Sequence, residues 1–177
     1  MLEGTTTFGV GNELDNTITG NASVNLLLGG AGNDTINGRG GNDVLFGEAG
    51  NDRFVFTAGT GGDVIGDFTR GQDRIDVSAF GFSFAQLLPN FIQNGNVGAI
   101  NLGNGDFIVL HNVTMSTLTA ADFIFAAVAE PAPKGGPPVM EPLGDWGGEA
   151  RANLFADAIQ FASDDLHWHR PQADAFV

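Results

Sequence analysis

The chain contains no cysteine and few basic residues, and each shortage excludes a class of function. Without cysteine it has no disulfide framework and no thiol chemistry. Lysine and arginine number 7 against 21 aspartates and glutamates, so the formal net charge is −14. Nucleic acid and anionic membrane surfaces are therefore not expected as partners. No apolar run reaches the roughly 18 residues of a membrane-spanning helix, so no membrane insertion is expected.

The motifs of several common catalytic sites are also missing. The chain has three histidines but no H-E-x-x-H, and it has no G-x-S-x-G elbow. No Walker lysine follows a glycine-rich turn. We therefore predict that the protein is not an enzyme. The first residues lack the pattern of a secretory signal peptide, which fits either a cytoplasmic chain or export by a route that does not read the N-terminus.

What the chain does contain is a nine-residue repeat. Three consecutive blocks place Gly, Asn and Asp at positions four, five and six, and a large apolar residue at position eight: GGAGNDTIN (29–37), GRGGNDVLF (38–46) and GEAGNDRFV (47–55). The glycine-rich half indicates a tight turn, because glycine tolerates backbone angles that other residues avoid. The remaining residues indicate a very short strand with one inward side chain.

Two nonamers, each a turn and a strand, make one flattened coil. A coil is too thin to bury its own apolar residues, so coils must stack, with Ile36, Leu45 and Phe54 forming a ladder between two parallel sheets. Nonamers n and n+2 then lie on the same edge. This places Asp34 over Asp52 on one edge and Asp43 on the other.

Stacked carboxylates repel one another, so a cation is expected between them. Ca²⁺ takes 6–8 oxygen ligands at ~2.3–2.6 Å in irregular geometry, whereas Mg²⁺ prefers a strict octahedron and retained water. The sequence therefore predicts several calcium ions as cofactors.

The nonamer frame extends upstream of these blocks, with amides in place of acids. Blocks 11–19 and 20–28 carry Asn16 and Asn25 at the sixth position. An amide keeps a carbonyl ligand but loses the charge. These turns are expected either to be weak or empty cation sites, or to form a capping turn with an amide ladder.

Downstream, the frame slips by two residues after Val55, which predicts a longer strand over 53–57. Asp63 and Asp73 then restore the turn-Asp-strand pattern. Three strong cation sites are expected, at the pairs Asp34/Asp52, Asp43/Asp63 and Asp52/Asp73. Asp67 and Asp76 are possible additional ligands or solvated surface residues.

The repeats match G-G-x-G-x-D-x-U-x, and the chain resembles the RTX family of bacterial secreted proteins. The resemblance implies a right-handed parallel β-roll with Ca²⁺ between consecutive turns of one edge. The segment DFTRGQDRIDVSAFG (67–81) is similar to the one that closes such rolls, including those of serralysin-type proteases. The resemblance covers about residues 11–126. The expected metal-binding residues are Gly30, Gly32, Asp34, Gly41, Asp43, Gly50, Asp52, Gly61, Asp63 and Asp73, followed by Asn16, Asn25, Asp67 and Asp76.

The predicted fold is all-β: a parallel β-roll whose open end is capped by a short helix and a β-hairpin. Ser83 and Gln86 form a capping box at the start of a helix that ends at Pro89. The segments 99–102 and 107–110 flank the turn sequence GNGD, which indicates a hairpin.

Five segments are expected along the chain. They are a lead-in (1–10), the roll (11–76), the capping segment (77–126), a proline- and glycine-rich linker (127–148) and a helical arm (149–177). The arm is amphipathic, with Leu154, Phe155, Ala158, Ile159, Ala162 and Leu166 on one face. It could dock on the roll, act as an export signal or bind a partner. The final Asp-Ala-Phe-Val resembles the end of proteins exported by type I secretion.

The predicted function is that of a secreted, non-catalytic protein that folds on binding calcium and has a structural, adhesive or surface-assembly role. It would be extracellular or on the cell surface, exported by type I machinery, with self-assembly or docking to a larger particle through residues 149–177. One alternative is the accessory or secretion module of an exported hydrolase or polysaccharide-modifying enzyme. Another is a decoration protein on a phage or other particle.

Overall fold

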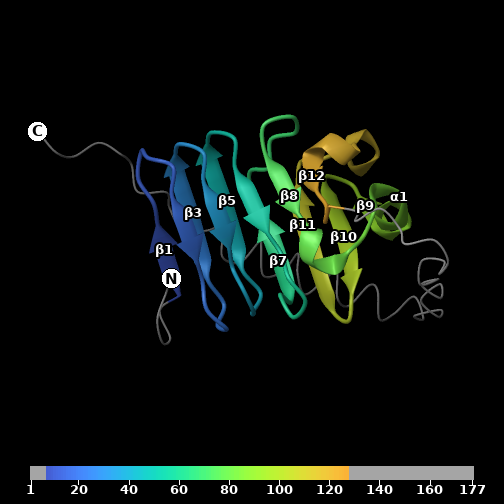
Figure 1. Ribbon diagram of the computed structural model, residues 1–177, viewed down its shortest axis with the longest axis horizontal. Helices are drawn as coiled ribbons and strands as arrows, with labels where there is room; N and C mark the ends of the chain where they lie inside the picture. The colour runs from blue at the N-terminus through green and yellow to red at the C-terminus, as the bar shows by residue number, and fades with distance from the viewer. Residues whose placement is uncertain (1–6, 128–177) are drawn as a thin grey trace, which may run out of the picture. The chain divides into compact units, whose positions relative to one another are not determined.

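The computed structural model describes residues 7–127, whose strands lie side by side in a stack (Figure 1). One sheet has seven strands in the order β1-β3-β5-β7-β11-β10-β9, and the other has five in the order β12-β8-β6-β4-β2. The strands are β1 (Phe8–Val10), β2 (Thr17–Thr19), β3 (Leu26–Ala31), β4 (Thr35–Asn37), β5 (Val44–Ala49), β6 (Arg53–Val55), β7 (Gly62–Ile65), β8 (Arg74–Asp76), β9 (Phe91–Asn94), β10 (Val97–Gly103), β11 (Asp106–His111) and β12 (Phe123–Ile124).

The chain passes from one sheet to the other at every turn, so successive strands pair with the strand one coil away. Ile18 lies beside Ile36, and Ile36 beside Phe54, in parallel register. The offset is 18 residues, which confirms that two nonamers make one coil. The predicted parallel β-roll is confirmed, with about four coils from β1 to β8.

The core is the ladder of eighth-position residues between the two sheets. Their side chains are fully buried, because inward and outward residues alternate along a strand and these residues face the space between the sheets. The ladder consists of Leu27, Ile36, Leu45, Phe54, Ile65 and Ile75. Each coil therefore contributes two core side chains, and stability depends on the neighbouring coils.

Two features of the roll differ from the sequence-based expectation. The strand predicted over 53–57 ends at Val55, and the two additional residues enter the following turn instead. This turn places Phe56 in the core, with 1% of its surface exposed. The second feature is β1, which lies in the segment expected to be a lead-in. Its inward residue is Gly9, so no apolar eighth position marks it in the sequence.

The far end of the stack is closed by the predicted cap. The helix α1 (Phe84–Leu87) begins where the backbone N–H of Ser83 donates to Oε1 of Gln86 at 2.9 Å. The hairpin β10–β11 is confirmed, and β9 extends it by antiparallel pairing with β10. A second cluster of aromatic rings fills this end of the core, formed by Phe84, Phe91, Phe123 and Phe125. In Figure 1 this cap stands at the end of the stack opposite β1.

The predicted linker, apart from residue 127, and the predicted amphipathic arm lie outside the described residues, and the domain boundaries remain predictions. Within residues 7–127, no helix is long and apolar enough to cross a membrane.

Candidate metal sites at the acidic turns

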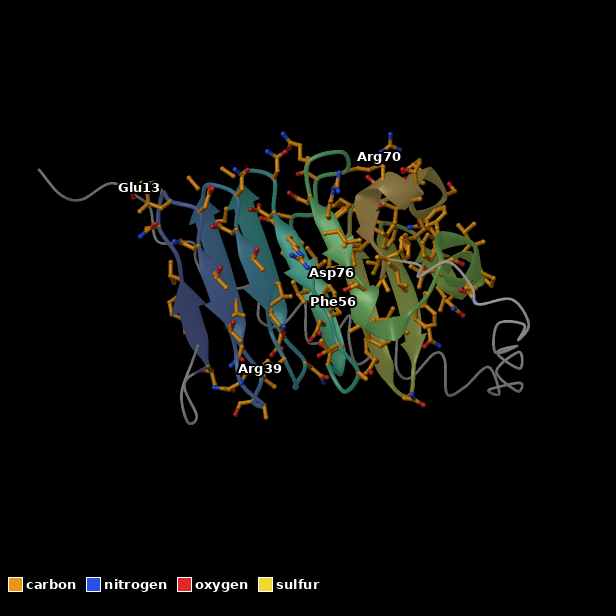
Figure 2. All side chains as sticks on the ribbon, viewed as in Figure 1. Glu13, Arg39, Phe56, Arg70 and Asp76 are labelled. Atoms are coloured by element: carbon orange, nitrogen blue, oxygen red, sulfur yellow. The ribbon has the colours of Figure 1, made fainter. Side chains whose placement is uncertain are left out.

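The turns lie along two opposite edges of the roll, and the sixth-position aspartates lie on them. Figure 2 labels Glu13 and Arg70 on one edge and Arg39 on the other. Asp34, Asp52 and Asp73 belong to the first edge, and Asp43 and Asp63 to the second, as the 18- to 21-residue spacing of their contacts shows. All five are at most 4% exposed. Burial of so many carboxylates is costly unless each is paired or hydrogen-bonded.

One oxygen of each aspartate is fixed by the coil before it. The backbone N–H of Asp34 donates to Oδ1 of Asp52 at 2.8 Å. The same contact joins Asp43 N–H to Asp63 Oδ1 at 2.9 Å, and Asp52 N–H to Asp73 Oδ1 at 3.0 Å. The three aspartate pairs expected from the sequence are therefore brought together. Their role in binding metal stays a prediction.

The other oxygen of three aspartates has no hydrogen-bond partner in the described part of the chain. These atoms are Oδ2 of Asp34, Asp43 and Asp52, and all three are buried. Each of the three expected pairs contains at least one such oxygen, and the pair Asp34/Asp52 contains two. A buried acceptor without a partner is unusual in a folded protein, and a bound cation would satisfy it.

The space beside each unpartnered oxygen borders the first glycine of the nonamer. A Cβ added at Gly29 would lie 2.3 Å from Asp34 Oδ2 and 2.6 Å from the carbonyl oxygen of Gly47. Added at Gly38, it would lie 2.0 Å from Asp43 Oδ2, and at Gly47, 2.2 Å from Asp52 Oδ2. The sequence analysis did not assign these glycines to the site. Their recurrence at the first position of every clean block was the signal that could have found them.

The donor set fits a hard cation. Within residues 7–127, no three His, Cys, Asp or Glu side chains gather where they could hold a metal together. Carboxylates meet in pairs, so the other ligands would be backbone carbonyls, such as Gly47 O, which borders Gly29 together with Asp34 Oδ2. Oxygen ligands of mixed type and irregular placement suit Ca²⁺.

The other predicted glycines shape the turns. A positive φ, which only glycine adopts readily, occurs at Gly30 (108°), Gly32 (109°), Gly41 (122°), Gly50 (151°) and Gly61 (84°).

Burial also raises the pKa values of several aspartates in these turns. It raises the pKa of Asp43 to about 6, against a hydrogen bond from the Asn25 backbone that lowers it. Burial likewise raises the pKa of Asp52 to about 6, and the charge of Asp73 adds to the effect. Burial raises the pKa of Asp63 to about 8 despite a hydrogen bond from Thr60, and it raises the pKa of Asp73 as well. Without a cation, the roll therefore favours protonated carboxyls.

The remaining turns are closed by their own residues. Oδ1 of Asn16 accepts the N–H of Asn12, and Oδ1 of Asn25 accepts the N–H of Asn21, both at 2.8 Å. Each amide oxygen is thus engaged within its own turn, and both alternatives for these turns stay predictions.

Each of the last two aspartates has its second oxygen engaged within its own turn. Thr60 Oγ1 donates to Asp63 Oδ2 at 2.5 Å, and Thr69 N–H donates to Asp73 Oδ2 at 2.7 Å.

The two possible additional ligands are engaged in other contacts. Asp67 accepts the N–H groups of Gly47 at 3.0 Å and Glu48 at 2.7 Å, so it caps a turn of the preceding coil. Asp76 forms an ion pair with Arg53 and accepts the N–H of Ser78. Burial acts to raise the pKa of Asp76, but these two partners outweigh it and hold the pKa below its usual value.

Two further aspartates, in the cap, continue the stack of aspartates on the turns. The sequence analysis gave them no role. Asp106 accepts the N–H groups of Gly59 at 2.8 Å and Gly61 at 2.9 Å through its two oxygens. Asp122 accepts the N–H of Gly71 at 3.1 Å. Residues 106–108 repeat the Asp-x-apolar order of the nonamer, which was the available signal.

The sequence of the roll matches a known family model. The model of the RTX calcium-binding nonapeptide repeat (4 copies) matches three overlapping segments, residues 10–45, 19–54 and 29–65. These segments contain the three aspartates with unpartnered oxygens. No curated protein matches the chain significantly.

The solved structures that are similar to this chain include two subunits of one enzyme and a lipase. The AlgE6R3 subunit of the mannuronan C5-epimerase of Azotobacter vinelandii is 30% identical, with 71% of this chain and 84% of that subunit covered and a TM-score of 0.31. The AlgE6R2 subunit of the same epimerase is 29% identical over 67% of this chain and 92% of that subunit, with a TM-score of 0.33. The extracellular lipase LipA of Serratia marcescens is 20% identical over 64% of this chain, with a TM-score of 0.46, and the match spans 20% of the lipase.

Proposed function

Because this chain belongs to the family of proteins with RTX calcium-binding nonapeptide repeats, we propose that it is a module that folds when calcium binds between consecutive turns of one edge. The observation that carries the proposal is the set of three buried Oδ2 atoms, with at least one in each expected aspartate pair. Asp34, Asp43 and Asp52 would hold the ions through these oxygens, together with backbone carbonyls such as that of Gly47.

The residues of the roll explain why folding would depend on the ion. Ordering the glycine-rich turns costs more backbone entropy than ordering other residues. Burying Asp43 and Asp52 as anions adds a desolvation cost, which is the main cause of their raised pKa values. Bound calcium would supply positive charge that offsets this cost. Any ligand that binds only the folded chain stabilises it, by about 2.7 kcal/mol per site at 100 times the Kd.

The direct test is circular dichroism of the full chain in chelator and in calcium. Extracellular calcium modules have a Kd of roughly 10⁻⁴–10⁻³ M. We therefore expect β-structure to appear over that calcium range. Magnesium is the control ion, and we expect it to be much less effective because it requires a regular octahedron. Equal β-structure in chelator and in calcium would refute the proposal.

For the biological role, the accessory-module alternative has the more specific support. The chain spans 84% and 92% of two subunits of a mannuronan C5-epimerase. Those subunits are parts of a polysaccharide-modifying enzyme, and the catalytic motifs considered above are absent from this sequence. On this proposal the chain is a calcium-dependent accessory module of a secreted protein that acts on a polysaccharide. Isothermal titration of the calcium-loaded protein with mannuronan would test it, with a neutral glucan as the control; no heat from either would count against it.

A structural or adhesive role is the second candidate, and it rests on residues 149–177. Light scattering would compare the full chain with a chain ending at Ala129, each with and without calcium. Calcium-driven assembly that needs the C-terminal residues supports this role. A monodisperse sample in every case supports the accessory module.

Secretion by a type I exporter is part of the same proposal. The uncleaved C-terminal residues 149–177 would carry the export signal, as their last four residues suggest. Co-expression with a type I exporter should release the full chain into the medium but retain a chain ending at Ala129. Equal release of both would exclude a signal in this segment.

A further inference from the structure

The two ends of the roll are finished differently. At one end, α1, the β9–β10–β11 strands and β12 cover the last coil. At the other end, β1 and β2 are the outermost strands of their sheets, and no described strand pairs with their outer sides. Figure 1 shows β1 at this end of the stack. Strand edges left open in this way are ready to pair with another chain.

The hydrogen bonds of β1 show which backbone groups face outward. Thr7 O accepts the N–H of Leu26, and Gly11 N–H donates to Leu28 O, so alternate residues of this segment bond to β3. In a parallel pair, the residues between them point their backbone groups the other way. The N–H and C=O groups of Phe8 and Val10 therefore face the open edge.

The outermost strand β1 is short, with three residues, but its side chains and backbone carry no other protection of an edge strand. Proteins block such edges with charged side chains, proline or bulges. The residues of β1 are Phe8-Gly9-Val10, with none of these. Four of the six large apolar side chains that are most exposed in residues 7–127 lie in this first coil: Phe8 (54%), Val10 (57%), Leu14 (64%) and Val24 (44%).

We propose that this end of the roll is a dimerisation surface, and that its occupant is a second copy of the chain related by a two-fold axis. The two-fold axis runs perpendicular to the two sheets and passes beside β1. Rotation about it brings β1 of one copy against β1 of the other in antiparallel pairing. The same rotation reverses the strand direction, so it exchanges the two edges of the roll. The first-edge turn of one copy (residues 11–16) therefore faces the second-edge turn of the other (residues 20–25).

This exchange makes the charges of the two copies compatible. The first-edge turn carries Glu13 and Asp15, whereas the residues of the second-edge turn have no charge. The acidic turns of the two copies would thus face neutral turns rather than each other. Exposed Leu14 of one copy would face exposed Val24 of the other, twice by symmetry.

The spacing of the coils also allows this contact. A coil rises by one strand spacing of ~4.8 Å, so paired β1 strands leave the facing turns about 10 Å apart. Facing sheets with interdigitated side chains pack at about the same distance. The two-fold pair is favoured because it sets acidic turns against neutral ones; head-to-tail growth would instead place β1 against β9, the outermost strand of the seven-stranded sheet at the capped end.

Sedimentation equilibrium of the calcium-loaded full chain tests the proposal, and we expect a reversible dimer. Val10→Lys should weaken the dimer by at least about tenfold, because lysine protects an edge strand. The control is Ile92→Lys on β9, the outermost strand at the capped end, which should leave the dimer unchanged. A chain that is monomeric at every concentration overturns the proposal, and so does a dimer that both lysine variants leave intact.

Two substitutions at one position then test the two-fold arrangement. Val24→Glu would place a carboxylate opposite Glu13 and Asp15 of the second copy, whereas Val24→Lys would place an ammonium group there. The lysine variant should dimerise at least about tenfold more tightly than the glutamate variant, because like charges across an interface cost several kcal/mol. Equal affinities would rule out the arrangement. Circular dichroism in calcium separates loss of the dimer from loss of the fold, and hence from failure of the proposed calcium-dependent folding.

Discussion

The backbone N–H of Asp34 donates a hydrogen bond to Oδ1 of Asp52, one coil further along the chain, at 2.8 Å. The contact leaves Oδ2 of Asp34 buried beside the carbonyl oxygen of Gly47. The carboxylate of Asp52 therefore fixes the turn that contains Asp34. Oδ2 of Asp34 itself is left for a cation. The same arrangement recurs at Asp43 and Asp52.

Asp52 belongs to two of the three pairs, so its charge should matter most. We expect Asp52→Asn to raise the calcium midpoint of folding by about tenfold or more, because two sites lose a negative ligand. In chelator, the same variant should be no less folded than the original chain, because burial of a charge is removed. Calcium titrations followed by circular dichroism check both. Glu13→Gln is the matched control, since Glu13 is exposed and has no described partner, and an equal shift in that variant would contradict the assignment.

The pH dependence should have opposite signs with and without calcium. The pKa values of Asp43 and Asp52 are raised to about 6, and that of Asp63 to about 8. A raised pKa stabilises the folded state at low pH and loses that contribution as the pH rises through the folded-state value. In chelator, the free energy of unfolding should therefore fall between about pH 5 and pH 8.

Calcium affinity should change in the other direction, because the ligand carboxyls must lose their protons before they bind the ion. The calcium midpoint should decrease as the pH rises over the same range. Circular dichroism of the chain in chelator and calcium titrations, both at each pH, provide the two measurements. A calcium-free roll that becomes more stable toward pH 8 would contradict the raised pKa values.

Two glycine substitutions distinguish an effect on the proposed cation site from a general effect on the turns. Gly29→Ala should weaken calcium binding, because its Cβ would lie 2.3 Å from Asp34 Oδ2 and 2.6 Å from Gly47 O. Gly40→Ala is the control, since its closest neighbour would be Gly59 O at 3.3 Å. Neither glycine has a positive φ, so strain from a left-handed backbone does not enter the comparison, and circular dichroism of both variants in calcium separates a lost site from a lost fold. Isothermal titration with calcium should show a lost or weakened site in the first variant only.

The cap should depend on Asp106. Asp106→Ala removes both acceptors of the Gly59 and Gly61 N–H groups, which are bound at 2.8 and 2.9 Å. Hydrogen bonds to charged groups contribute roughly 1.5–3 kcal/mol each, so we expect a loss of about 3 kcal/mol in the free energy of unfolding. Denaturant unfolding in saturating calcium measures it. Glu13→Gln, at an exposed residue with no described partner, should change this free energy by less than about 0.5 kcal/mol.

Much of the roll and of its candidate sites could be read from local pattern. The nonamer period set the coil length, the inward ladder that includes Leu45 and Phe54, and the pairing of Asp34 with Asp52. These features follow from short-range rules, because a strand residue faces alternate sides and a stacked repeat has a fixed offset. The capping box at Ser83 and the GNGD hairpin were equally local signals.

Other features required the folded chain. Contacts between distant residues decide which aspartate oxygens accept a hydrogen bond, and the repeat pattern does not encode these contacts. Asp63 Oδ2 accepts a hydrogen bond from the Thr60 hydroxyl of an irregular turn, whereas the equivalent atom of Asp43 has no hydrogen-bond partner within residues 7–127. Asp67 resembled an additional ligand in sequence, but in the roll it accepts Gly47 and Glu48 N–H groups of another coil.

The sequence alone thus determined that the chain winds into a parallel roll with carboxylates stacked on its turns, because period and residue type act locally. The tertiary structure decided which of those carboxylates keep a free oxygen, and that Asp106 closes the ladder at the capped end. It also decided that β1 leaves the other end open. These outcomes depend on residues far apart in the chain meeting across coils, and their backbone hydrogen bonds are made or left unmade only in the folded state.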